Sequence, residues 1–143
     1  HMFGAEKVVI FGRRRIDNRG LVGSANYTLV DKINGLDENQ NVDVDLIQQY
    51  FLENSLFPIF VEQGGENAYE LDWTMLITTI QAMRKTPCIV MGEENSGIPQ
   101  NVLDLDIPNK IVSIPQKGVI RSFNVSAAFS VVTSQMVGKM GWY

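Results

Sequence analysis

The sequence predicts an α/β domain with a mostly parallel sheet that is covered by helices on both faces. Short apolar runs, which are typical of strands, alternate along the chain with stretches whose apolar residues recur at helical spacing. Strands separated by helices pair in parallel, because each connection must return over a face of the sheet. The 143 residues contain no internal repeat or linker, so we expect one domain over residues 2–143. His1 before Met2 is typical of an expression-tag remnant.

The first part of the chain predicts two strands. Residues 6–11 form a short apolar run that Gly12 stops, which predicts a buried strand. Residues 17–26 are rich in Gly, Asn and Ser and predict a loop or a frayed helix. Residues 27–33 predict a weaker strand, and the polar residues 34–41 a surface loop.

The middle of the chain predicts helix, strand and helix. Apolar residues at helical spacing predict a helix from Val44 to about Glu53, with Asp43 as its cap. Residues 56–61 predict a strand in which Pro58 favours a sheet edge or a strand start. Asp72 is expected to cap the next helix, which ends before Pro87 and has one apolar stripe: Leu76, Ile77, Ile80 and Met83.

The last part predicts two more strands and two helices. Residues 88–91 are expected to form a strand and residues 92–98 a loop, and Pro99 suits the first turn of a short helix through residue 105. Residues 111–114 predict the last strand. A final helix is expected over residues 125–137, with these side chains on one side: Ala128, Phe129, Val132 and Met136.

Composition narrows the function classes. No apolar run is long enough to cross a bilayer, and no signal peptide opens the chain. A single cysteine, Cys88, excludes an internal disulfide and suits a reducing, cytoplasmic compartment. The net charge of −4 opposes nucleic-acid binding overall. Arg13, Arg14 and Arg15 nevertheless form a dense basic cluster, which is either a solvated loop or a local phosphate contact.

Parallel sheets bind ligands at the carboxyl ends of their strands, so the loops after Val61, Met91 and Ile114 are the expected sites. In residues 92–98 two glycines bracket acidic and polar residues, which allows close approach of a ligand to the backbone. The same pattern also fits a tight strand-to-helix connection with solvated acids. No basic residue of a phosphate-binding loop is present in it.

The other two loops are equally open to two interpretations. Ser122, Asn124 and Ser126 lead into the final helix and can cap it. With apolar Ile114 and Phe123 nearby in sequence, the same segment suits an adenosine-like ligand, which needs an apolar slot and backbone hydrogen bonds. In residues 61–65, the carboxylate of Glu62 beside two glycines can accept hydrogen bonds from a ribose or amino group, or can lie in an exposed turn.

Together and in this order, these segments resemble the SpoU (TrmH-like) branch of the SPOUT methyltransferases. The family motif G-x-E-x-x-G-[IL] matches residues 92–98, with Glu94 at the acidic position. The motif I-P-x-x-G-x-x-x-S-[LF]-N-V-[SA] matches residues 114–126, including Ser122 and Asn124. The run Gly-Val-Ile-Arg-Ser-Phe-Asn-Val looks especially like the eukaryotic-type tRNA guanosine 2′-O-methyltransferases.

The resemblance implies a fold and a ligand. The family's α/β sheet ends in a C-terminal trefoil knot, and its members bind S-adenosylmethionine among three knot loops, releasing S-adenosylhomocysteine. Gly92, Ile114 and Phe123 match positions that hold this cofactor, with the turn at Glu62 alongside. The family also implies a homodimer packed partly through the last helix, here residues 125–137.

The implied activity is methyl transfer to a ribose 2′-hydroxyl of tRNA or rRNA, without a metal. A hydroxyl is a poor nucleophile, so it needs in-line placement and proton removal. Ser122 and Asn124 would orient the reacting groups, and Glu94 would fix its loop. Arg121 would hold an RNA phosphate, and Arg13 and Arg14 are also expected to bind RNA.

One departure leaves alternatives open. The family's first motif, an Asn-x-Gly segment followed by an arginine, precedes the strand that begins here at residue 6, and only residues 1–5 precede it in this sequence. We therefore expect either a truncated chain or a degenerate relative. The first alternative to an enzyme is a catalytically impaired knotted dimer that binds cofactor or RNA without turnover. The second is a flavodoxin-like or Rossmann-like small-molecule domain with an accidental motif match.

Overall fold

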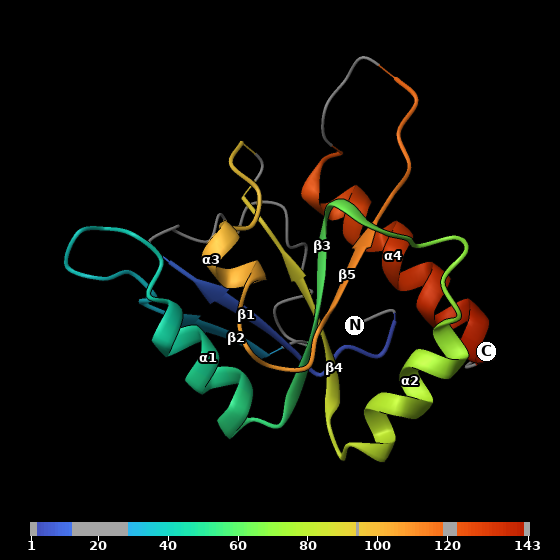
Figure 1. Cartoon of the computed structure of the whole chain (residues 1–143), viewed down its shortest axis with the longest axis horizontal. Helices are drawn as coiled ribbons and strands as arrows, with labels where there is room; N and C mark the ends of the chain where they lie inside the picture. Colours follow the sequence, from blue (N-terminus) through green and yellow to red (C-terminus); the bar gives the residue numbers. More distant parts are fainter. Residues whose placement is uncertain (1–2, 13–28, 94, 119–122, 142–143) are drawn as a thin grey trace. The chain divides into compact units, whose positions relative to one another are not determined.

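The computed structural model describes residues 3–12, 29–93, 95–118 and 123–141. The chain divides into two compact units, residues 1–47 and residues 48–143, which are described separately here (Figure 1). Every described pair of strands is parallel, as expected. The predicted loop over residues 17–26 and the Arg13–Arg15 cluster lie outside the described residues.

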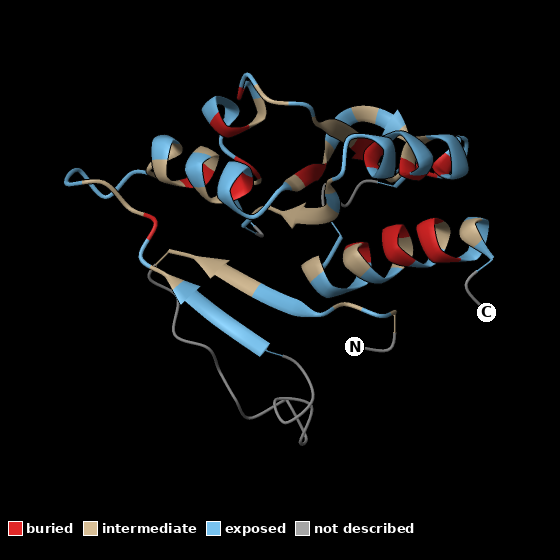
Figure 2. Ribbon diagram, turned by 90° about the horizontal axis from the view of Figure 1, so that it is seen from below, coloured by how far each residue is buried: buried red, intermediate tan, exposed pale blue. Residues whose placement is uncertain are grey.

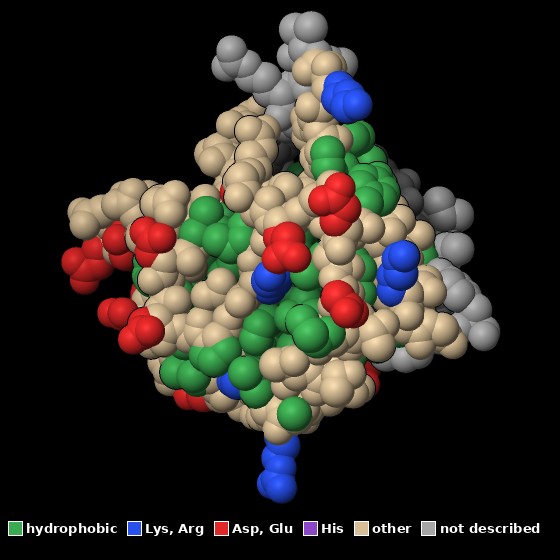
Figure 3. Space-filling model, turned by 45° about the vertical axis from the view of Figure 1, so that its right-hand side comes forward, with side chains coloured by type: hydrophobic (Ala, Val, Ile, Leu, Met, Phe, Trp, Pro, Cys, Tyr) green, Lys and Arg blue, Asp and Glu red, His purple; other side chains and the backbone are tan. Residues whose placement is uncertain are grey.

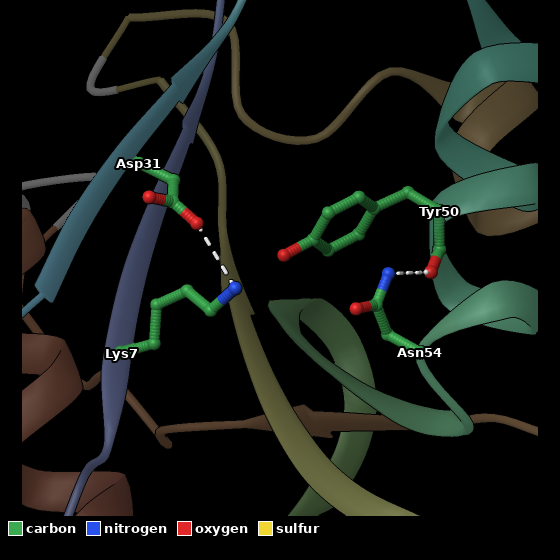
Figure 4. A network of polar contacts seen from close by, with 4 residues as sticks. All are labelled: Lys7, Asp31, Tyr50 and Asn54. Atoms are coloured by element: carbon green, nitrogen blue, oxygen red, sulfur yellow. Dashed lines mark hydrogen bonds and ion pairs between the residues drawn. The ribbon is translucent and has the colours of Figure 1, made fainter.

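The first unit contains a two-stranded parallel sheet of β1 (Lys7–Phe11) and β2 (Leu29–Ile33). The ammonium of Lys7 and the carboxylate of Asp31 form an ion pair of 2.9 Å between the strands (Figure 4). The prediction that the first strand is buried was wrong, since all residues of β1 are exposed or intermediate (Figure 2) and Val8 is 44% exposed. Within this unit β1 has only one described neighbouring strand, which leaves much of its surface uncovered.

The polar stretch after β2 is a turn that leads into a helix. The carboxylate of Asp37 accepts hydrogen bonds from the amides of Asn39 and Asn41, and Leu36 forms an antiparallel bridge with Val42. Asp43 then caps helix α1 (Val44–Glu53) as predicted, because its Oδ1 accepts from the amide of Leu46 at 3.0 Å.

The end of α1 belongs to the second unit. The ring of Phe51 packs edge-on against Phe60 with 6.4 Å between ring centroids. Asn54 follows the helix and donates from Nδ2 to the carbonyl of Tyr50 at 2.9 Å (Figure 4).

The sheet of the second unit has the strand order β4-β3-β5, with β3 (Leu56–Asn67), β4 (Thr86–Met91) and β5 (Lys110–Ser113). Residues 57–60 are all buried, and successive side chains point to opposite faces, so both faces of β3 are covered. Pro58 favoured a sheet edge or a strand start; the strand start is confirmed, since β3 begins at Leu56, and the edge was wrong. β3 is central, and Pro58 is tolerated because pairing with β5 begins only at Ile59.

Helix α2 (Trp73–Ala82) is capped by Asp72 as predicted, with Oδ1 accepting from the amide of Met75 at 2.9 Å. Its buried residues are Trp73, Ile77 and Ile80. Met83, which was expected on the buried stripe, is 46% exposed because it lies at the carboxyl cap of the helix. Figure 2 shows buried positions along the helices of this unit.

The remaining helices differ in length from the prediction. α3 (Gln100–Leu103) is shorter, and Pro99 precedes it as the N-cap residue. α4 (Val125–Met140) is longer and ends at Gly141, which adopts a left-handed conformation with φ of 65°. Of the expected side, Phe129 is only half-buried; the buried residues are Ala128, Val132, Thr133, Met136 and Val137. α4 packs against α2, and Thr74 donates to the carbonyl of Lys139 at 3.3 Å.

In the described parts of the chain, no helix combines the length and apolar character needed to cross a bilayer. Over the same residues, no group of three or more His, Cys, Asp and Glu side chains is arranged to hold a metal ion.

Candidate functional site

The three segments that the sequence analysis selected lie at the same end of the sheet, where the strands have their carboxyl ends. Val61 of β3 is in register with Met91 of β4 and with Val112 of β5. Because all three strands are parallel, the segments that follow these residues emerge side by side. The site therefore lies among the three segments that follow the carboxyl ends of these strands (Figure 1).

A pocket of about 320 Å³ lies among these segments. Its volume is in the range of roughly 300–1,000 Å³ that small-molecule sites occupy. All four predicted cofactor-binding residues, Glu62, Gly92, Ile114 and Phe123, line it. The other lining residues are Val61, Gln63, Met91, Glu93, Asn95, Ser96, Gly97, Ser113, Gln116, Val125 and Ala128.

The first wall of the pocket is a bulge in β3. Both Val61 and Glu66 pair with Val112, so the residues between them leave the ladder. The sequence predicted that this strand ends at Val61, which was wrong. β3 continues to Asn67 and pairs with β5 again at Glu66 and Asn67. The carboxylate of Glu62 accepts from the amide of Gln63 at 2.8 Å and from that of Ile98 at 2.9 Å. Both of its oxygens thus have backbone donors.

The second wall is the loop after β4. Gly97 donates to the carbonyl of Glu93 at 2.8 Å, and the amide of Glu93 donates back to Gly97 at 3.2 Å. A Cβ on Gly92 would lie 2.2 Å from the carbonyl carbon of Gly97, so only glycine fits there. The close approach expected at these glycines was that of a ligand; the structure shows that the backbone of Gly92 lies close to that of Gly97. Glu94 lies outside the described residues.

The third wall follows β5 and includes the start of α4. Phe123 lines the pocket and is 42% exposed, which leaves its ring available to a ligand. Asn124 is the N-cap of α4; its Oδ1 accepts from the amide of Ser126 at 3.0 Å and from its hydroxyl at 2.6 Å. The capping interpretation of this residue is therefore confirmed. Asn124 is not among the described residues that line the pocket, and Arg121 and Ser122 lie outside the described residues, as do Arg13 and Arg14.

The described lining of the pocket combines apolar, uncharged polar and acidic residues. Glu62 and Glu93 are its only charged residues among those described, and no lysine or arginine is among them. Such a lining suits an uncharged or cationic ligand and repels an anionic phosphate. In the view of Figure 3, the described Lys and Arg side chains are separated from one another by other side chains.

Sequence reasoning did not select several polar residues that line the pocket, among them Glu93, Ser113 and Gln116. Ser113 is the last residue of β5, and its hydroxyl donates to the carbonyl of Gly65 at 2.8 Å. Its position at the carboxyl end of a predicted strand is the sequence signal that could have identified Ser113 as a pocket residue. Glu93 and Gln116 belong to the two motif segments, but nothing in the motifs distinguishes them from loop residues.

Solved structures share this fold. An rRNA methyltransferase from Sinorhizobium meliloti with bound AdoMet superposes with a TM-score of 0.69 at 16% identity, over 94% of this chain and 46% of that one. AviRb from Streptomyces viridochromogenes, in complex with the cofactor AdoMet, gives 0.68 at 16% identity over 99% and 53%. The TrmH/SpoU tRNA-modifying enzyme of A. aeolicus gives 0.65 at 19% identity over 99% and 64%. The chain thus spans about half the length of the first two structures.

Sequence comparison settles the family. No curated protein sequence matches the chain. The model of the SpoU rRNA methylase family, however, matches residues 1–134, which is most of the chain. This excludes the interpretation of the two motifs as an accidental match on an unrelated small-molecule domain. The chain belongs to the SpoU rRNA methylase family.

Proposed function

We propose that the pocket binds S-adenosylmethionine and that the protein takes part in methylation of RNA. The observation that carries the proposal is the convergence of three loops, two of them bearing the family motifs, on one pocket in a member of this family. Two of the similar structures contain AdoMet, which supports the choice of ligand.

The chemistry of the pocket supports the same ligand. S-adenosylmethionine carries a sulfonium cation and an adenosine but no phosphate. The carboxylate of Glu93 favours the cation, and the apolar surfaces of Ile114 and Phe123 suit the adenine ring. Dinucleotides and flavin phosphates would meet carboxylates in place of the basic or amide-rich surface that phosphate requires.

We further propose the ribose 2′-hydroxyl of tRNA or rRNA as the acceptor. The bound cofactor would supply an activated methyl group, so the residues of the chain need only orient and deprotonate the hydroxyl. In this proposal Ser122 and Asn124 orient the reacting groups, and Glu94 fixes its loop. Arg121, Arg13 and Arg14 would hold RNA phosphates. Asn124 also caps α4, so it would in addition place the start of that helix beside the pocket.

The proposal includes the trefoil knot and homodimer of the family. α4 would follow the threaded segment, and residues of α4 that are not fully buried within the protomer, such as Phe129 and Met140, would supply part of a subunit interface. Sedimentation at micromolar concentration should show a dimer, and a monomer would contradict this part.

Two assays test the proposed activity. Calorimetric titration with S-adenosylmethionine should show binding, and no binding would overturn the assignment of the pocket. Transfer of tritiated methyl groups to total RNA should label ribose hydroxyls. Binding of the cofactor without labelling of RNA would show that this polypeptide only holds the cofactor, and would contradict the proposed methyltransferase activity.

A further inference from the structure

We propose that Glu62 is a positioning residue that fixes the distance between two walls of the pocket and does not itself bind the cofactor. The inference concerns the geometry of the pocket, and only its effect on S-adenosylmethionine affinity rests on the proposed function. It replaces the expectation, drawn from the sequence, that Glu62 accepts hydrogen bonds from the ligand.

The carboxylate joins segments that are far apart in the chain. Oε2 of Glu62 accepts from the amide of Ile98, 36 positions later, at 2.9 Å. Oε1 accepts from the amide of Gln63 at 2.8 Å, which orients the carboxylate. Ile98 is only 7% exposed, so water is a poor replacement for this acceptor.

The partner loop is shaped around the same carboxylate. Gly97 has φ of +69°, and a Cβ at this position would lie 2.5 Å from Oε2 of Glu62. A side chain at Gly97 would therefore displace either the loop or the carboxylate. The glycine is required twice, by its left-handed conformation and by the approach of Glu62.

The far end of the bulge is held independently by β5. The hydroxyl of Ser113 donates to the carbonyl of Gly65, and Lys110 forms an ion pair with Glu66. A Cβ on Gly65 would lie 2.7 Å from the backbone of Ile111. Since the bulge is fixed to β5 at this end, the carboxylate of Glu62 places the β4 loop relative to a rigid wall.

Amide exchange without cofactor tests the inference directly. In Glu62→Gln and Glu62→Ala, NMR-detected hydrogen exchange at the amide of Ile98 should become at least about 10-fold faster, since an amide-to-carboxylate hydrogen bond is lost or weakened. Glu70→Gln is the control, because it removes the same charge from an exposed side chain that follows β3 and does not contact the β4 loop; exchange at Ile98 should be unchanged. Unchanged exchange at Ile98 in Glu62→Ala would overturn the inference.

A second variant covers the case in which Glu62→Ala does not fold. Gly97→Ala should accelerate exchange at Ile98 by displacing the carboxylate, and should do so less when combined with Glu62→Gln. Equal effects in both backgrounds would show that Glu62 and Gly97 are uncoupled and contradict the inference.

Cofactor affinity separates positioning from direct contact. If the pocket binds S-adenosylmethionine, Glu62→Gln should weaken this binding about 10-fold and should also make exchange at the amide of Ile98 faster. Weakened binding with unchanged exchange would show that Glu62 contacts the ligand and would overturn the positioning role. If the unsubstituted protein does not bind the cofactor, the proposed function fails, while the exchange measurement still decides the role of Glu62.

Discussion

The side chain of Asn124 accepts hydrogen bonds from both the amide and the hydroxyl of Ser126, and so begins helix α4 at the edge of the pocket. Asn124→Ala should reduce the free energy of unfolding by about 1 kcal/mol, the usual cost of losing a cap. Asn124→Asp keeps the capping oxygen and should unfold like the original protein. Denaturant titration of both variants measures this.

The same pair of variants separates capping from catalysis. If Asn124 acts only through the helix, cofactor affinity and methyl transfer should survive in Asn124→Asp. Loss of transfer in Asn124→Asp with unchanged stability would assign the amide group a part in the reaction itself.

Buried Trp73 anchors α2 to the end of β3. Its indole Nε1 donates to the carbonyl of Ala68 at 2.8 Å, and the two residues are 1% and 0% exposed. Trp73→Phe removes the N–H donor and leaves the buried carbonyl of Ala68 without this hydrogen bond. The loss should lower the free energy of unfolding by about 1–3 kcal/mol. Tyr69→Phe, at a residue that is 48% exposed, should change it by less than about 0.5 kcal/mol. Equal effects would contradict this account of the anchor.

The fold was predictable from the sequence wherever one local signal decided it. Asp43 and Asp72 cap the helices they were expected to cap, and the apolar runs became strands. Pro58 left a sheet edge and a strand start open, because its tolerance depends on where β5 starts to pair, which no local pattern reveals. The bond between Glu62 and Ile98 was equally inaccessible, because it depends on β3 and β4 being neighbours.

The thiol of Cys88 is expected to be inert near neutral pH. Burial raises the pKa of Cys88 from 9.0 to about 11, so the thiol stays protonated and poorly nucleophilic. A thiol-specific chromogenic reagent at pH 8 should react slowly with the folded protein and fast after denaturation. Fast reaction of the folded protein would contradict the burial of this group.

The same pKa shift predicts a loss of stability at high pH. The folded protein holds the thiol proton more tightly than the unfolded chain, so this stabilisation is complete below about pH 9 and is lost as the pH rises to about 11. Cys88→Ser should lose less stability across this interval than the original protein. Parallel pH curves for the two proteins would rule out the contribution.

Two glycines near the pocket should respond differently to alanine. Gly92→Ala places a Cβ 2.2 Å from the backbone of Gly97 and should displace the β4 loop, weakening cofactor binding at least about 10-fold. Gly64 has φ of +81° but open space around it, so Gly64→Ala should cost only about 1 kcal/mol of stability through backbone strain. Cofactor titrations and denaturant curves of both variants test this difference. Equal loss of cofactor affinity in the two variants would show that backbone strain, and not the steric contact, causes the loss.

The central claim is that one pocket between three loops holds S-adenosylmethionine. Titration of the cofactor into isotopically labelled protein, followed by amide chemical shifts, tests it most directly. The account predicts saturable shifts at Gly92, Gly97, Ile114 and Phe123, with the amide of Thr86, at the amino end of β4, unaffected. Saturable shifts confined to residues outside these loops, or no shifts at millimolar cofactor, would contradict it.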